Sequence, residues 1–281
     1  MLSQAGHMLV GVADSMMVGR LGAAPLAASS ISNVIFSILM SLGIGITFAM
    51  TPLVAKADGE KDHHGIAEAL KHGTVINVIS SLVLFLIMLG AMQALPFLDQ
   101  PEEVVVLAGP YLVIISSSII PLLIFQNYRQ FAEGLSLTKQ AMRISITGNI
   151  LNVVLNYILI FGKLGFEPLG LNGAGYATLI SRIVMAAMMG AYIFMMPRFK
   201  QYREGFRFSS YSKPLFNKML RIGLPAGFQF IFEVGAFGFG AIMMGWLGVK
   251  QLAAHQIAIN LAALTYMAAS GPVSYTHLTL P

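Results

Sequence analysis

The chain has 281 residues, of which 56% are hydrophobic and only 10% are charged. A soluble globular domain carries roughly 25% charged residues, so the composition excludes a soluble domain and predicts an integral membrane protein. The chain contains no cysteine, which excludes disulfides, thiolate catalysis and cysteine metal sites. The formal net charge of +5 resembles that of a nucleic-acid-binding protein. However, the basic residues are few and segregated, so we expect no nucleic-acid partner.

Eight apolar runs of about 18 residues or more follow one another along the chain and qualify as membrane-spanning helices. They cover residues 1–19, 25–50, 74–95, 104–126, 144–162, 173–196, 222–245 and 252–271. We therefore expect an all-α polytopic helix bundle. The first six runs would form one lobe (residues 1–196), a cytoplasmic link would cover residues 197–221, and the last two runs would begin a second lobe (residues 222–270).

The basic residues predict the orientation of these runs. Of the 17 lysines and arginines, 13 lie in the links after the second, fourth and sixth runs, and only Arg20, Lys163 and Lys250 lie in the alternate links. The positive-inside rule places the more basic side, and with it the amino terminus, in the cytoplasm. Arg182 is the one cation inside a run, and the sequence does not identify its partner.

The link at residues 197–221 is both basic and aromatic. Two interpretations fit it: an interfacial amphipathic helix that joins two bundles, or a solvated loop whose aromatic side chains face lipid. In either case this link is the predicted boundary between the lobes. Its aromatic residues are Phe199, Tyr202, Phe206, Phe208 and Tyr211.

An internal repeat supports two lobes. Residues 15–31 align without gaps to residues 241–257, with eight of 17 positions identical. The shared pattern G-x-LG-x₃-LAA, which begins at Gly19 and at Gly245, indicates a duplication. Because the first run then corresponds to the seventh, the repeating unit has six helices and both copies enter the membrane in the same direction. Transporters whose halves are related by an axis along the membrane normal have such parallel repeats.

A second six-helix half would continue beyond the eighth run. Residues 271–281, GPVSYTHLTLP, resemble neither an apolar span nor a basic tail. We therefore expect that the chain is a fragment with a non-native tail at residues 271–281, and that the fragment alone is inactive in transport.

Two carboxylates do not follow the pattern of polar links between apolar runs. Of the 12 acidic residues, ten lie in polar links, whereas Asp14 and Glu233 lie inside apolar runs. Ionised side chains are costly in hydrocarbon, so such residues usually face a cavity and mark an ion or substrate pathway. Burial favours a protonated carboxyl group and a bound cation favours the charged form, which is the competition that ion coupling requires. As alternatives, Asp14 could reach water from near its helix end, and Glu233 could be a protonated, hydrogen-bonded core residue.

The fifth run presents three amides on one helical face. Asn149, Asn152 and Asn156 are spaced three and four residues apart. Their amide oxygens are neutral ligands suited to an alkali cation beside one carboxylate. The alternative is that they form hydrogen bonds between helices, which commonly stabilise membrane bundles.

Several ordered segments resemble the multidrug and toxic compound extrusion (MATE) transporters, in particular their NorM-type branch. The resemblance runs from residue 1 to about residue 267. The segments are GVADSMMVGRLG (11–22), TPLVAKADGEKD (51–62), FAEGLSLTKQAM (131–142), GNILNVVLNYILIFG (148–162), LGLNGAGYAT (169–178), GLPAGFQFIFEV (223–234) and LAAHQIAIN (252–260).

The resemblance implies a twelve-helix, multi-pass antiporter of the inner membrane that exports cationic or amphiphilic drugs and toxins. Entry of Na⁺ or H⁺ would drive export, and a cavity between the two lobes would open alternately to either side. It implies no cofactor besides the coupling ion. The partners of such a transporter would be small-molecule substrates and the lipid bilayer, and the transporter would act as a monomer.

The resemblance also implies roles for individual residues. Asp14 and Glu233 match the acidic positions of the family's first and seventh helices, and Gln256 matches a position that lines the second lobe's cavity. In another branch of the family the position of Asn156 is an aspartate, so a purely proton-carrying first-lobe site is less expected here. The predicted cation and substrate site comprises Asp14, Asn149, Asn152, Asn156, Glu233 and Gln256, with Asp14 and Glu233 as candidate Na⁺ ligands.

Two other functions compete with drug export. One is a lipid-linked oligosaccharide flippase of the same superfamily, although such cavities tend to be markedly basic and only Arg182 is cationic within the runs. The other is an intramembrane enzyme that uses Asp14 and Glu233 as an acid pair, which would require both carboxyl groups within reach of one substrate atom. The sequence contains neither a phosphate-binding G-x-x-x-x-G-K-[ST] loop nor a G-x-S-x-G nucleophile elbow, so neither an ATP-driven pump nor an enzyme is expected.

Overall fold

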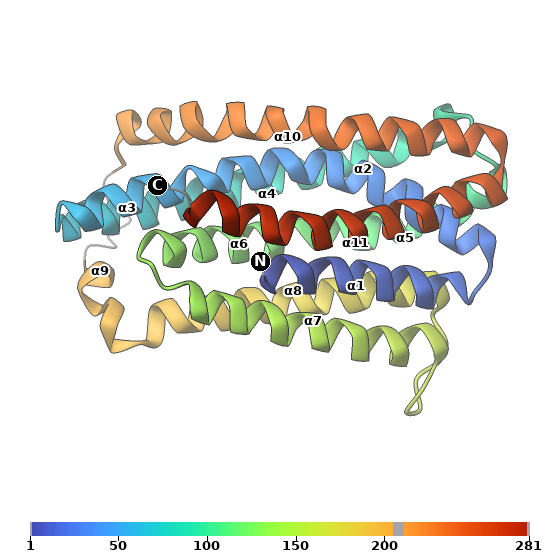
Figure 1. Cartoon of the computed structure of the whole chain (residues 1–281), viewed down its shortest axis with the longest axis horizontal. Coiled ribbons are helices and arrows are strands. Elements are labelled where there is room, and N and C mark those ends of the chain that lie inside the picture. Colours follow the sequence, from blue (N-terminus) through green and yellow to red (C-terminus); the bar gives the residue numbers. More distant parts are fainter. Residues whose placement is uncertain (1, 205–210, 280–281) are drawn as a thin grey trace.

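The computed structural model describes residues 2–204 and 211–279, apart from the side chains of residues 2–9, 94, 203–204, 264 and 266–279. Within these ranges the chain forms helices and no strand, as its composition predicts (Figure 1). The elements are α1 (Leu2–Gly19), α2 (Ala23–Phe48), α3 (Met50–Gly59), α4 (His63–Ala94), η1 (Leu95–Leu98), α5 (Glu102–Ser117), α6 (Ile119–Gly134), α7 (Thr138–Phe161), α8 (Gly170–Met195), η2 (Pro197–Phe199), α9 (Lys200–Glu204), α10 (Lys213–Leu247) and α11 (Val249–Thr279).

Six helical segments of the described chain are long and apolar enough to cross a membrane, so the protein is a multi-pass membrane protein. They coincide with six of the eight predicted runs. The other two predicted runs fall in α1, whose segment Val10–Gly19 is a shorter apolar helix, and in α11. The six segments are Ala23–Gly59, His63–Gln93, Glu102–Gly134, Thr138–Phe161, Gly170–Met195 and Lys213–Leu247.

Most helices extend past the predicted runs because the polar links also adopt helical structure. Helix α4, for example, begins at His63, well before the predicted start at residue 74. The Asp62 side chain caps it by accepting a 2.9 Å hydrogen bond from the Gly65 backbone N–H, as aspartate commonly does at a helix start.

The connections alternate between the two ends of the bundle. The turn after α3, the turn between α6 and α7, and α9 lie at one end, on the left in Figure 1. The turns after α1, α7 and α10 lie at the other end. The connections predicted to be basic are therefore gathered at one end of the molecule, as the count of alternating spans requires.

Two of the predicted spans contain a short break. One break separates α2 from α3 after Phe48, and the other separates α5 from α6 after Ser117. Pro52 and Pro121 lie four residues after those two positions. Proline has no N–H to donate to the carbonyl group four residues earlier, so each helix ends where that hydrogen bond is lost.

The two copies of the repeat share an unusual turn. Gly22, between α1 and α2, has φ 129° and ψ 177°, and Gly248, between α10 and α11, has φ 126° and ψ 171°. Only glycine adopts this conformation without strain. Each glycine carbonyl then accepts the first hydrogen bond of the next helix, from Leu26 N–H at 3.4 Å and from Leu252 N–H at 3.1 Å. The LG pair of the repeat is thus required by the turn.

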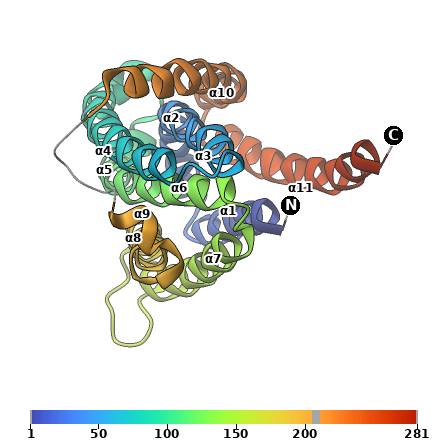
Figure 2. The ribbon, with the colours of Figure 1, turned by 90° about the vertical axis from the view of Figure 1, so that its left-hand side faces the viewer.

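Helix α2 occupies the centre of the bundle. It contacts α1, α4, α5, α6, α10 and α11, which surround it in the end-on view (Figure 2). Its crossing with α10 is close because glycines meet there. A Cβ atom on Gly45 would collide with the backbone of Gly227, and a Cβ atom on Gly227 would lie 2.9 Å from the Leu42 carbonyl oxygen. Small residues commonly allow membrane helices to approach in this way.

The link between the predicted lobes is shorter than the sequence indicates. Helix α10 begins at Lys213, inside the predicted link of residues 197–221, and η2 and α9 occupy residues 197–204. The basic first turns of α10 therefore lie within the predicted link.

The aromatic side chains of η2 and α9 are buried instead of facing lipid or water. Phe199 and Tyr202 are 1% and 6% exposed, and both rings contact the ring of Phe131 in α6. The expectation of a lipid-facing or solvated position is wrong for these two residues. Phe206 and Phe208 lie outside the described residues.

The first turn of α10 is anchored to α4 through His72, which is fully buried. The backbone N–H of Ser212 donates to His72 Nε2 at 2.8 Å, and the imidazole ring contacts the rings of Tyr211 and Phe216 edge-on. Because Nε2 accepts a hydrogen bond, the ring is neutral and carries its proton on Nδ1, which lies 2.8 Å from the Glu68 carbonyl oxygen.

The close crossing of α2 and α10 can be tested by adding a methyl group. Gly45→Ala places a Cβ atom against the α10 backbone, and we expect the free energy of unfolding in detergent to fall by roughly 1–3 kcal/mol. Gly90→Ala in α4 is the matched control, because a Cβ atom there meets nothing within 4 Å. Equal stabilities of the two variants in a denaturant titration would show that the helices are not in close contact.

Candidate functional site

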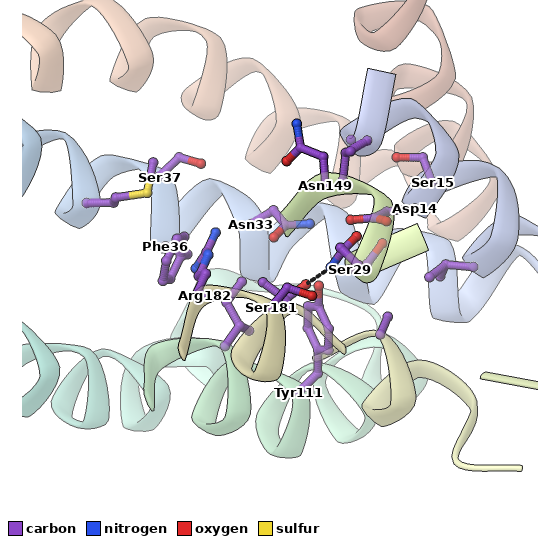
Figure 3. Close-up of a pocket in the computed structure, with 18 of the residues that line it drawn as sticks. Asp14, Ser15, Ser29, Asn33, Phe36, Ser37, Tyr111, Asn149, Ser181 and Arg182 are labelled. Atoms are coloured by element: carbon purple, nitrogen blue, oxygen red, sulfur yellow. Dashed lines mark hydrogen bonds between the residues drawn. The ribbon is translucent and has the colours of Figure 1, made fainter. Parts of the chain in front are cut away.

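A polar cavity of about 240 Å³ lies between α1, α2, α5, α7 and α8 (Figure 3). Its walls carry one acidic and one basic side chain, Asp14 and Arg182, among uncharged polar groups. All five helices belong to the predicted first lobe, so the cavity is internal to that lobe. The uncharged polar groups are those of Ser15, Ser29, Asn33, Ser37, Tyr111, Asn149, Asn152, Thr178 and Ser181.

Asp14 is held by a chain of amides. The Asn156 side-chain nitrogen, Nδ2, donates to Asp14 Oδ1, and it also donates to Asn152 Oδ1 at 3.1 Å. Asn152 in turn donates from its Nδ2 to Thr178 Oγ1 at 3.3 Å. One row of hydrogen bonds therefore joins α1, α7 and α8, and two oxygen atoms from different helices converge on a single amide group.

The predicted polar face of α7 is present and buried. Asn149, Asn152 and Asn156 are 8%, 5% and 0% exposed. Their bonds to α1 and α8 are the interhelical hydrogen bonds that one interpretation predicts. At the same time, Asn149 Nδ2 and Asn156 Oδ1 have no hydrogen-bond partner among the described residues. Buried polar atoms rarely lack partners, so these two atoms point to a missing ligand or water.

Arg182, whose partner the sequence did not identify, enters the same cavity from α8. Its Nη1 donates to the Ser118 hydroxyl at 2.5 Å, at the break between α5 and α6. Its guanidinium carbon lies 4.8 Å from the centre of the Phe36 ring, a distance at which a cation and an aromatic face attract each other. Among the described residues no carboxylate oxygen lies within 4.0 Å of it.

Sequence analysis did not single out the contribution of α2. Ser29, Asn33 and Ser37 line the cavity, and they recur at intervals of four residues. This spacing places three polar groups on one face of the helix. The pattern was visible in the sequence and would have identified α2 as a cavity wall.

Gln256 does not line this cavity. Its Oε1 accepts a 2.6 Å hydrogen bond from the Ser30 hydroxyl of α2, and its Nε2 donates to Asn260 at 3.2 Å. In the described chain it therefore joins α2 to α11.

Glu233 is also separate from Asp14. It lies on an exposed face of α10, beside the 78% exposed Phe232, and it is absent from the walls of the cavity. It has no hydrogen bond or ion pair with another described residue. The two carboxylates are therefore not walls of a common cavity in this chain, and an acid pair for enzyme catalysis is not assembled.

No cluster of three or more His, Cys, Asp or Glu side chains that could hold a metal ion occurs among the described residues. The cavity offers one carboxylate and several neutral oxygens. Such a set suits a monovalent hard cation better than a transition metal.

Residues 1–158 match a family model described as MatE. The chain belongs to the MatE family. It is 32% identical over 94% of its length to a probable multidrug resistance protein NorM of Rhizobium meliloti, and 32% identical over 92% of its length to the multidrug resistance protein NorM of Vibrio parahaemolyticus.

A solved structure agrees with the MatE fold. The inward-facing conformation of a multidrug resistance MATE family transporter of the MOP superfamily superposes with a TM-score of 0.76 over 91% of this chain, at 23% identity. This MatE chain covers 57% of that transporter and 57% of each of the two NorM relatives. The match therefore concerns a little more than half the length of these proteins.

Proposed function

We propose that this chain is part of a cation-coupled antiporter that exports cationic or amphiphilic compounds by alternating access. The proposal rests on membership of the MatE family, on relatives named as multidrug resistance proteins, and on the cavity around Asp14. The amino terminus would lie in the cytoplasm of a cell whose inner membrane holds the transporter.

The observation that carries this proposal is the convergence of Asp14 Oδ1 and Asn152 Oδ1 on the Asn156 Nδ2 group. An amide NH₂ group between two oxygen atoms occupies the place that a cation would take. Rotation of the Asn156 amide by half a turn would turn Oδ1, the atom that now lacks a partner, toward the two acceptor oxygens. A cation bound among these three oxygen atoms would replace the amide hydrogens, and oxygen atoms are the ligands that hard cations prefer.

A proton is the other candidate ion for this site. Protonated Asp14 would no longer accept the Asn156 hydrogen bond as a charged group, so proton binding and cation binding would release the same amide. Na⁺ and H⁺ would therefore compete for one carboxylate. Exchange of either ion against a substrate is the coupling that an antiporter needs.

Glu233 is proposed as a separate site for a cation or a cationic substrate. It lies near the middle of α10, a helix apolar enough to span the membrane. Its side chain is exposed in the described chain. Because a charged group facing lipid is costly, we infer that this face of α10 borders a polar compartment in the assembled transporter.

Dye export tests the proposed function. In cells that express the complete transporter of which this chain is proposed to be part, ethidium efflux is expected to depend on an inward gradient of Na⁺ or H⁺, with the two gradients varied independently. Glu233→Gln and Asp14→Asn should each reduce efflux to the level of cells without the gene while leaving membrane insertion intact. Glu167→Gln is the matched control, since Glu167 is an exposed carboxylate in the connection between α7 and α8. Undiminished efflux in either site variant would contradict the assignment of that residue.

The proposed orientation has its own test, because the chain contains no cysteine. Glu60→Cys and Glu167→Cys introduce single thiols at exposed positions at opposite ends of the bundle. A membrane-impermeant maleimide should label Cys at position 167 in intact spheroplasts, and at position 60 only after permeabilisation. The reverse pattern would show that the amino terminus lies outside the cytoplasm.

A further inference from the structure

Arg182 is a charged residue of the cavity that cation coupling does not use. Cations within membrane spans usually pair with an anionic group. Arg182 instead donates to the neutral hydroxyl of Ser118 and lies over the ring of Phe36. Asp14 is the only acidic residue that lines the same cavity, and it is not within ion-pairing distance. The N–H donors of the guanidinium group therefore have no carboxylate acceptor among the described residues.

A second donor lies at the level of Arg182 along the bundle. Helices α7 and α8 run antiparallel. Asn152 of α7 bonds to Thr178 of α8. One turn earlier in α7, a Cβ atom on Gly148 would meet the side chain of Met185, which lies later in α8. Arg182 follows Thr178 by four residues, or about 6 Å of helix. The α8 backbone at Arg182 therefore lies near the level of Asn149, whose side chain lines the same cavity. The Nδ2 group of Asn149 is buried and has no partner among the described residues.

The cavity consequently has two poles. Figure 3 shows Arg182 beside Phe36 at one side of the labelled residues and Asp14 at the other, with Asn33 and Ser29 between them. The first pole offers the hydrogen-bond donors of Arg182, and the second offers the acceptor oxygens around Asp14. Asn149 lies between them in this view. Among the side chains that the structure describes, the titratable and charged groups on the cavity walls are Asp14 from α1, Tyr111 from α5 and Arg182 from α8, and the cavity-lining residues of α2 and α7 add none.

We propose that Arg182 and Asn149 form a binding site for a small monovalent anion, a halide or a carboxylate, in the cavity that holds Asp14. Guanidinium and amide N–H groups are donors only in this geometry, and charge-assisted hydrogen bonds from arginine are well suited to anions. When Asp14 is ionised, its negative charge balances the positive charge of Arg182. A cation bound at Asp14 leaves the charge of Arg182 uncompensated, so the anion enters together with the cation.

Direct chloride binding tests this site without any transport. The purified chain is placed in lipid nanodiscs in a chloride-free gluconate buffer and titrated with ³⁶Cl⁻. We expect saturable binding whose affinity falls at least about tenfold in Arg182→Gln. In a medium of intermediate dielectric constant, a single charge at close range changes the affinity for an anion several-fold to tenfold or more. Arg182→Lys keeps the charge and should retain binding, and Asn149→Ala should weaken it. Arg221→Gln removes a cation from an exposed position of α10 and serves as the control.

Asp14→Asn separates the anion site from a merely structural role for Arg182. Removal of the neighbouring negative charge should tighten chloride binding several-fold, whereas damage to the cavity would weaken it. This variant also separates the two proposals, because it should lose cation binding and gain chloride affinity.

Displacement of ³⁶Cl⁻ by unlabelled acetate would identify a carboxylate as an accepted ligand, and displacement by bromide alone would identify a halide site. Absence of saturable binding in both the unmodified chain and Asp14→Asn, or unchanged binding in Arg182→Gln, would overturn the proposal.

Discussion

The Asp14 carboxylate requires a polar partner within the membrane, and the packing of α1 against α7 supplies one. The Asn156 amide bonds to it directly, and Asn152 and Thr178 extend the network to α8. Removal of α1, α7 or α8 would leave polar atoms of this network without partners, which is costly in hydrocarbon. The same network that satisfies the charge thus fixes how α1, α7 and α8 lie relative to one another.

Small residues and prolines allow this arrangement. Gly148 lets α8 approach α7 closely enough for its Cβ position to lie against Met185. Pro121 ends the hydrogen-bonding pattern of α5 at Ser117, and the following residue, Ser118, provides the hydroxyl that Arg182 contacts. Gly45 and Gly227 bring α10 against the central helix α2. Backbone features visible in the sequence therefore determine where the polar side chains meet.

The sequence predicted the helical class, the positions of the spans and the buried asparagine face, because each depends on hydropathy or helical period alone. The buried positions of Phe199 and Tyr202 and the early start of α10 depend on contacts with α4 and α6, which a local pattern does not contain. Within the site, Asp14 and Asn156 were predicted separately. The hydrogen bond between them and the position of Arg182 in the wall of the same cavity follow from tertiary packing. The relation between Asp14 and Glu233 was likewise beyond local reasoning, since it requires the position of α10 in the bundle.

Binding of ²²Na⁺ to the purified chain in nanodiscs tests most directly the claim that the first-lobe cavity holds a cation. At alkaline pH, protons compete least for the carboxylate. In a Glu233→Gln background, which removes the second proposed cation site, the account predicts saturable binding that is abolished by Asp14→Asn and weakened by Asn152→Ala, because both supply oxygen atoms that face Asn156. Glu167→Gln, which removes an exposed carboxylate outside the cavity, should leave this binding unchanged. Sodium binding that survives Asp14→Asn in this background, or that is absent from the unmodified chain, would contradict the account.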